Sequence, residues 1–483
     1  MPRKSGRKKS ARPEAPPAPS WRVAAAVCAW GLAAHLVFLR DNSATAFFVG
    51  DGLYFLQQAR HLAAGTALDA GLPYHPPLVG WLLAPLWWMV APARVLLAAK
   101  ALMAVVNAAT YLLLYLLLAP RLRHAALFLL LAPLYFGELM LSATPNSEAV
   151  YRLLLAALLL LGKRWPAAGG VLHGLAALTR AEHVAAGLAL LVYGLARRPH
   201  RRFAAVTGAA AVAVLLPYTA ATAVDLRAYN ERHAATLPEP LPTVVPVSFY
   251  GPLNFALAHT EEGIHFSRRR LPPSGGDATL DPNHGVHNAY VVHGYRIGLE
   301  AIVDAPGRFL GRSWRKAVHS LSALVYGWTW RDLPKGDTWV RQPVDMAYAR
   351  APWYEVAAGL LMVLGAWRLR RDRWLLGVGF ALVAYRLAVN VAFFPYLRSM
   401  MIAAPFALLL LFSGLEWLLR RYTPHVVGAL WVGLALFQLT TGLALFQLTT
   451  GLGERRFLQQ GERDAQGAIL DDRPVVLTAA PRH

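Results

Sequence analysis

The chain is patterned as a series of long apolar runs separated by short polar connections. A helix needs about 20 predominantly apolar residues to cross the hydrocarbon core of a bilayer. Runs that approach or exceed this length lie at 21–39, 76–92, 95–118, 124–142, 148–162, 168–196, 203–224, 353–367, 374–394, 401–419 and 425–452. The pattern predicts an all-α fold, a polytopic membrane helix bundle with about 11–13 spans and large extracytoplasmic loops.

One of these runs leaves two arrangements open. The run at 168–196 is long for a single span and carries the polar sequence LTRAEH near its middle. It forms either one long helix or two half-helices that break at LTRAEH.

Changes in polarity divide the chain into five regions. They are a basic, disordered cytoplasmic tail at 1–20, an N-terminal transmembrane catalytic module at 21–224 with a first outer loop at 40–75, an extracytoplasmic loop region with interfacial helices at 225–352, C-terminal transmembrane helices at 353–452, and a polar C-terminal tail at 453–483.

Composition supports a membrane protein. Apolar residues make up 56% of the 483 residues and charged residues only 16%, whereas about a quarter of a soluble domain is charged. The net charge of +21 would suggest a nucleic-acid partner in a soluble protein. Here Lys and Arg cluster between apolar runs, which is typical of cytoplasmic loops that contact anionic lipid headgroups. We therefore predict membrane lipid as a partner and no nucleic acid.

Basic clusters also predict the orientation. LARRPHRR (195–202), RLRRDR (368–373) and LLRRY (418–422) should face the cytoplasm. The first run lacks a convincing cleavage site and reads as an uncleaved anchor with a cytoplasmic N-terminus. We expect a multi-pass protein of the cell (cytoplasmic) membrane whose active site is extracytoplasmic.

A single carboxylate, Asp51, stands at the predicted outer edge of the membrane, between ATAFFV and LYFLQQARHL. It is either a solvated helix-capping residue or a general base, which needs a carboxylate within reach of a hydroxyl at a partly shielded site. The sequence YHPPL follows. Pro76 and Pro77 stiffen the start of a span and should hold Tyr74 and His75 toward the same loop.

Other polar side chains lie in or at the ends of the predicted spans. They are Glu138, Glu148, Arg180, Glu182, Arg386, Asn390 and Arg398. Charged groups are costly there, so they indicate either a functional cavity or internal ion pairs. Arg180 and Arg398 could bind a phosphate at headgroup depth, because a guanidinium donates two parallel hydrogen bonds.

Three histidines, His284, His287 and His293, form a loose cluster in the large polar region. Histidines at i and i+3 can share a metal on a helix, but the surrounding Pro282 and Gly285 favour a plain loop. We predict no metal site and no cofactor, with a divalent metal as the less favoured alternative. The sequence contains neither a phosphate-binding P-loop nor a dinucleotide-binding fingerprint, which argues against nucleotide hydrolysis.

The order of these motifs resembles one superfamily. GDGLYFLQQARHLAAG with YHPPLVGWLLAPL, GVLHGLAALTRAEH, DAPGRFLGRSWRK and FPYLRSMMIAAPFALLL are similar to the GT-C integral-membrane glycosyltransferases, in particular to the dolichyl-phosphate-mannose protein mannosyltransferase and lipid A aminoarabinose transferase branch. The resemblance covers residues 21–420. It implies an inverting transfer of a sugar from a polyprenyl-phosphate donor to a hydroxyl of a glycan, lipid or protein acceptor at the outer face.

The resemblance also implies roles for single residues. Asp51 matches the catalytic base of the first loop, and Arg180 and Arg398 match residues that hold the lipid phosphate. The predicted substrate-binding residues are Tyr54, His75, Arg180, Glu182 and Arg398. Many relatives have Asp-Glu in the first loop, whereas Gly52 follows Asp51 here, so the choice between a hexosyl- and a pentosyltransferase stays open.

Two other classes of protein remain as alternatives. A transporter or flippase of a lipid-linked sugar would use the ionisable groups as a translocation path. A non-catalytic assembly protein would use them only for packing. Against a transporter, the sequence lacks two-half internal symmetry and has a large outer region.

Overall fold

The computed structural model describes most of the chain. The described residues are 18–41, 51–66, 72–122, 124–162, 164–260, 264–265, 268–269, 280–326, 328–335, 338–345, 352–395, 397–418 and 429. The predicted tail at 453–483, residues 1–17 of the predicted N-terminal tail, and all but one residue of the predicted span at 425–452 lie outside them.

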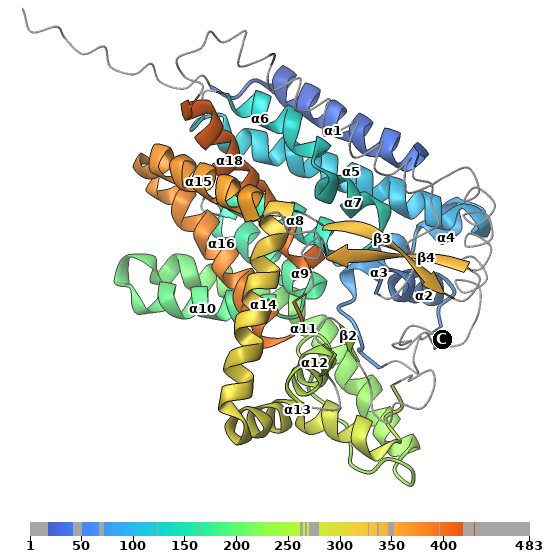
Figure 1. Cartoon of the computed structure of the whole chain (residues 1–483). Helices are drawn as coiled ribbons and strands as arrows, with labels where there is room; N and C mark the ends of the chain where they lie inside the picture. Colours follow the sequence, from blue (N-terminus) through green and yellow to red (C-terminus); the bar gives the residue numbers. More distant parts are fainter. Residues whose placement is uncertain are drawn as a thin grey trace, which may run out of the picture.

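Helices dominate the described residues (Figure 1). Those of the first half are α1 (Trp21–Asp41), α2 (Asp51–Ala63), α3 (Leu78–Leu83), α4 (Leu86–Met89), α5 (Val95–Leu118), α6 (Ala125–Leu131), α7 (Phe136–Ala143), α8 (Ser147–Ala157), α9 (Pro166–Thr179), α10 (His183–Ala196) and α11 (Arg201–Arg232). Those of the second half are α12 (Tyr250–His259), α13 (Gly285–Asp304), α14 (Pro306–Tyr326), α15 (Pro352–Arg368), α16 (Arg373–Ala392), α17 (Leu397–Met400) and α18 (Ala404–Leu418).

Two short antiparallel strand pairs accompany the helices. Strand β1 (Ile264–His265) pairs with β2 (Arg268–Arg269), and β3 (Trp328–Lys335) pairs with β4 (Thr338–Asp345). Both pairs belong to the predicted polar region at 225–352. The helical fold class is therefore confirmed, with β structure limited in the described residues to these two pairs.

Several helices suit a membrane. Within the described ranges, four helices are long and apolar enough to span: Trp21–Leu39, Pro92–Leu118, Arg198–Arg232 and Arg373–Ala392. Shorter apolar helices lie at Leu78–Met89, Ala125–Leu134, His183–Ala196 and Ala404–Leu418. The protein is thus a membrane protein with several apolar helices.

Some predicted runs are not continuous helices. The run at 76–92 is divided into α3 and α4 next to Pro85, and the run at 124–142 is divided into α6 and α7 next to Pro133. Proline lacks the amide hydrogen and its ring clashes with the preceding turn, which explains both interruptions. The run at 168–196 consists of two helices, α9 and α10, that break at Arg180–Glu182, so the second of the two arrangements left open is correct.

Glycines allow the closest helix contacts. A Cβ atom on Gly365 of α15 would overlap the carbonyl oxygen of Leu410, and one on Gly414 of α18 would overlap that of Leu361. The pairs α9–α11 and α12–α13 are built in the same way, with Gly170 and Gly294 against the backbone of the facing segment. Small residues let helix backbones approach closely and gain van der Waals contact.

We expect Gly414→Ala to lower the free energy of unfolding by about 1–3 kcal/mol, because the added methyl group has no space and must push α15 and α18 apart. The control is Gly359→Ala on α15, where an added Cβ meets nothing within 4 Å. There the better helix propensity of alanine should give an unchanged or slightly higher stability. Thermal unfolding of the purified protein in detergent measures both. Equal effects of the two substitutions would contradict the close contact.

Candidate functional site

Helix α2 carries a carboxylate at its N-terminal end. Asp51 is its first residue, and Leu53, Phe55 and Leu56 behind it are buried in the core. The N-terminal end of a helix carries a partial positive charge that favours a carboxylate. The side chain of Asp51 remains 16% exposed, so it is partly accessible from outside the protein.

An imidazole lies beside this carboxylate. The Nε2 atom of His75 is 4.0 Å from Oδ1 of Asp51, and the His75 side chain is buried. Its ring packs between Tyr54 and Tyr250, with centroid distances of 4.5 Å and 4.7 Å. Pro77 follows at the N-cap of α3, where the fixed φ of proline is well tolerated. The backbone therefore holds His75 at the wall of the site.

The segment before α3 is also hydrogen-bonded to the segment before α12. The amide of Phe249 donates to the carbonyl oxygen of Pro73 at 2.9 Å. Phe249 directly precedes Tyr250, and Pro73 stands two residues before His75. The bond between them therefore restrains the two rings relative to each other.

A guanidinium reaches Asp51 from the distant end of the chain. Arg398 on α17 pairs with Oδ2 of Asp51 through Nη2, and its Nε lies 3.3 Å from Oε1 of Glu148. Glu148 is buried in the first turn of α8. The hydroxyl of Ser399 donates to Oδ1 of Asn390 on α16 at 2.6 Å, which anchors α17 and thereby positions Arg398.

The break between α9 and α10 supplies the next two charges. Nη1 of Arg180 lies 2.9 Å from Oε1 of Glu148 and 3.0 Å from the hydroxyl of Ser147. Nε of Arg180 lies 2.6 Å from Oε1 of Glu182, and the same oxygen accepts from Nη1 of Arg386 at 2.9 Å. Arg386 is completely buried on α16.

The result is one continuous chain of alternating charges. Its carboxylates and guanidiniums are equal in number, and their formal charges cancel: Asp51, Glu148 and Glu182 against Arg180, Arg386 and Arg398. Removing charges from water costs several kcal/mol for each ion unless close partners compensate. Each charge has an opposite charge beside it in the network, which offsets part of this cost.

All the residues predicted for the site meet here. Asp51, His75, Arg180, Glu182 and Arg398 lie in or beside the ionic chain, and Tyr54 packs on His75. Glu148 and Arg386 were given no site role from the sequence, although both were noted as charged residues in or at the ends of predicted spans. Tyr250, the first residue of α12, carried no sequence signal, because only folding brings it to His75.

A second ion pair lies apart from this chain. Nη2 of Arg152 is 2.6 Å from Oε2 of Glu138, and the hydroxyl of Tyr111 donates to the same oxygen at 2.8 Å. Both charged side chains are almost fully buried. Arg152 follows Glu148 by one turn on α8, so the pair orients the helix that presents Glu148. The sequence left two possibilities for Glu138, a functional cavity or an internal ion pair. The structure contains the ion pair.

The plain loop favoured for the three histidines is wrong for His287 and His293, which lie on α13, and these two have different hydrogen-bond partners. Nδ1 of His287 accepts from the amide of Asp281 at 3.1 Å, and Nε2 of His293 lies 2.6 Å from Oε2 of Glu239. The ring of His284 packs on His287 at a centroid distance of 4.5 Å. The described residues contain no group of three His, Cys, Asp or Glu side chains that could hold a metal ion.

Comparisons with known proteins give a likeness of fold. No protein-family model and no curated protein match the sequence. The crystal structure of the Archaeoglobus fulgidus oligosaccharyltransferase, tethered with an acceptor peptide containing the NVT sequon, is similar with a TM-score of 0.45 and 12% identity over 92% of this chain. This chain spans 55% of the oligosaccharyltransferase.

The second similar structure is ArnT from Cupriavidus metallidurans in the apo state. It has a TM-score of 0.35 and 15% identity, and the likeness covers 82% of this chain and 78% of ArnT. Both likenesses concern the fold alone.

We expect Arg152→Met to destabilise the protein by about 3–5 kcal/mol, because it leaves the carboxylate of Glu138 buried without its cation. The double variant Glu138→Gln with Arg152→Met should recover much of this loss. Arg94→Met is the control, since Arg94 is exposed on the surface. Unfolding of all variants in the same detergent tests the pair. If the loss of stability in the double variant equals the sum of the losses in the Glu138→Gln and Arg152→Met single variants, the two side chains act independently and the pair is contradicted.

Proposed function

We propose that this chain is an inverting glycosyltransferase that moves a sugar from a polyprenyl-phosphate donor to a hydroxyl acceptor at the outer face of the membrane. The observation that carries the proposal is the continuous ionic chain from Asp51 through Arg398 and Glu148 to Arg180. It joins a partly exposed carboxylate to two arginines at one place, from four segments far apart in the sequence. Both kinds of group are needed for transfer from a phosphate to a hydroxyl.

In the proposed reaction, Asp51 is the general base. The acceptor hydroxyl gives its proton to the Asp51 carboxylate as its oxygen bonds to the anomeric carbon of the sugar. The bond between that carbon and the phosphate oxygen breaks on the opposite side, and the phosphate leaves with the electron pair. The anomeric configuration is therefore inverted. No group other than donor, acceptor and this chain is needed to balance the step.

Arg398 and Arg180 are the proposed phosphate ligands. A guanidinium fits a phosphate through two parallel hydrogen bonds, and preorganised cations stabilise the charge that develops on a leaving phosphate. In the ligand-free chain Arg398 is paired with Asp51 and Glu148. A donor phosphate would replace the carboxylate of Asp51 at Arg398 and so free Asp51 for the acceptor. Donor binding should precede acceptor activation.

Tyr54, His75 and Tyr250 are proposed to contact the sugar or the acceptor. Their rings lie together beside Asp51, and Tyr54 and His75 are buried. Glu182 is proposed to orient Arg180 from the side opposite Glu148. Together these groups would align the reacting atoms, which lowers the entropic part of the barrier.

The proposal includes a location and partners. The chain would lie in the cell (cytoplasmic) membrane with its N-terminus cytoplasmic and its site extracytoplasmic, and the module at 21–224 would carry most of the site. The acceptor would be a glycan, a lipid or a protein. A transporter would move the labelled sugar without changing its covalent bond, so product analysis separates that alternative from a transferase.

We expect Asp51→Asn to reduce transfer by about 100-fold or more, because removal of a general base costs about 10²–10⁴ in rate. The assay uses membrane vesicles and a panel of labelled polyprenyl-phosphate sugars. The matched control is Asp225→Asn, which removes an exposed carboxylate on α11 and should leave transfer unchanged. Retained transfer by a normally expressed Asp51→Asn protein would exclude Asp51 as the base.

We expect Arg398→Gln to raise the KM for the lipid donor and to lower kcat, because the side chain would contact the phosphate in both ground and transition states. Arg398→Lys should retain part of kcat, since it keeps the charge and loses the bidentate geometry. Steady-state kinetics with varied donor measures the effect. If the acceptor KM alone changes in both variants, Arg398 is not a ligand of the donor phosphate.

A further inference from the structure

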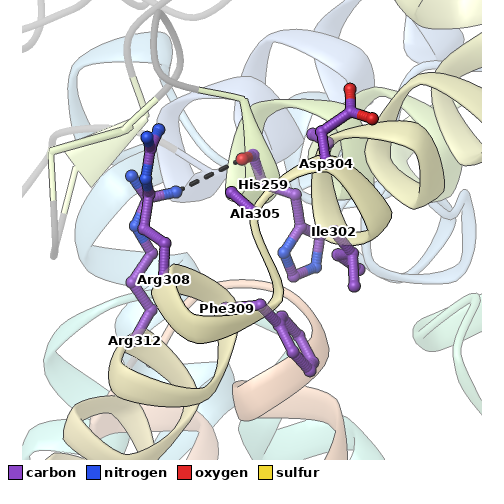
Figure 2. A pocket seen from close by; sticks show the side chains of 8 residues that line it. His259, Ile302, Asp304, Ala305, Arg308, Phe309 and Arg312 are labelled. Atoms are coloured by element: carbon purple, nitrogen blue, oxygen red, sulfur yellow. Dashed lines mark hydrogen bonds between the residues drawn. The ribbon is translucent and has the colours of Figure 1, made fainter.

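A cavity with a volume of about 280 Å³ opens where α12, α13 and α14 meet. Its lining residues, shown in Figure 2, are His259, Ala301, Ile302, Asp304, Ala305, Arg308, Phe309 and Arg312. None of them belongs to the ionic chain of Asp51. The guanidinium groups of Arg308 and Arg312 lie together on one side, and the carboxylate of Asp304 points away on the other (Figure 2).

Helix α14 concentrates positive charge at this cavity. Arg308, Arg312, Arg315 and Lys316 lie within about one quarter to one third of its circumference at 100° per residue. Burial lowers the pKa of Arg312, and the neighbouring Arg308 and Arg315 lower it further. Burial and the charge of Arg312 lower the pKa of Lys316 to about 8. An anion placed between these cations would relieve their mutual repulsion.

The opposite face of α14 is apolar and exposed. Leu310 is 66% exposed, Trp314 71% and Leu321 42%, and their spacing puts them on one side of the helix. A helix with a basic face and an exposed apolar face that includes Trp is typical of the membrane interface. The apolar face would enter the acyl region, which brings the cavity to the depth of lipid headgroups.

The wall of the cavity is fastened to the helix that precedes Arg398. The Nε2 atom of His259 lies 2.9 Å from the carbonyl oxygen of Ala392. Nζ of Lys316 donates to the carbonyl oxygens of Phe393 at 2.6 Å and Val391 at 3.3 Å. These carbonyls end α16, where a cation is favoured by the helix dipole.

We propose that this cavity binds the phosphate of an anionic membrane phospholipid between Arg308 and Arg312. The cavity supplies space, and the two guanidiniums supply the hydrogen-bond donors for phosphate oxygens. Leu310 and Trp314 set the depth of the helix in the bilayer. Inorganic phosphate shares the headgroup chemistry, whereas only the lipid is also held in place by its acyl chains in the bilayer. The bound lipid would hold α14 against the end of α16, on the side of the site that carries Arg398.

Native mass spectrometry of the full chain in detergent tests this proposal. The protein is titrated with phosphatidylglycerol, with zwitterionic phosphatidylcholine and with inorganic phosphate, and the bound species are counted. The test variant is Arg308→Gln with Arg312→Gln. The matched control is Arg227→Gln with Arg296→Gln, which removes the same charge from exposed positions on α11 and α13. Ala301→Phe, which fills the cavity and keeps both arginines, is a second test variant.

We expect one phosphatidylglycerol to bind more tightly than the rest, and its affinity to fall at least about tenfold in both test variants and to stay unchanged in the control. Millimolar phosphate should compete with the lipid only weakly. Binding of phosphate as tight as that of the lipid would assign the cavity to a free anion and overturn the lipid proposal. Equal losses in test and control variants, or equal binding of phosphatidylcholine, would overturn it as well. Circular dichroism of each variant verifies that it is folded.

Discussion

The ion pair between Asp51 and Arg398 joins α2 to α17, near the end of the described chain. A carboxylate and a guanidinium in a largely apolar surrounding must be met by opposite charges, because isolated ions there are costly. Glu148 meets Arg398 from α8, and Arg180 meets Glu148 from the break between α9 and α10. Each charge therefore requires the next helix to be in place. The site forms only when α2, α8, α9, α16 and α17 have come together.

The helices can meet in this way because glycines at their interfaces permit close contact. The break between α9 and α10 also lies where its charged residues can reach the neighbouring helices. Glycines on α15, α18 and α9 permit backbone contact where any side chain would overlap a carbonyl oxygen or a neighbouring side chain. The end of α9 leaves Arg180 and Glu182 outside regular helix, so both side chains can turn toward α8 and α16. Packing and ionic pairing thus reinforce one another, and the pair of Glu138 and Arg152 holds α8 from its other side.

Much of the fold could be predicted from the apolar pattern. The helical class and the boundaries of α1, α5, α15 and α16 follow from the positions of apolar, basic and polar residues, whereas the break at LTRAEH was only one of two arrangements left open. The interruptions near Pro85 and Pro133 were missed because hydropathy averages over a proline. The candidate site residues were named from their chemistry and from the resemblance to the GT-C enzymes, but their pairing was not predicted, since a sequence does not give the distance between Asp51 and Arg398. Tyr250 lay beyond sequence reasoning for the same reason.

The central claim is that a donor phosphate and the carboxylate of Asp51 compete for Arg398. Its most direct test is the affinity of the purified full chain for polyprenyl phosphate without sugar, compared between the native protein and Asp51→Asn. The account predicts tighter binding by the variant, because one competitor for Arg398 is removed while the arginine remains. Weaker or unchanged binding by the folded variant would contradict it.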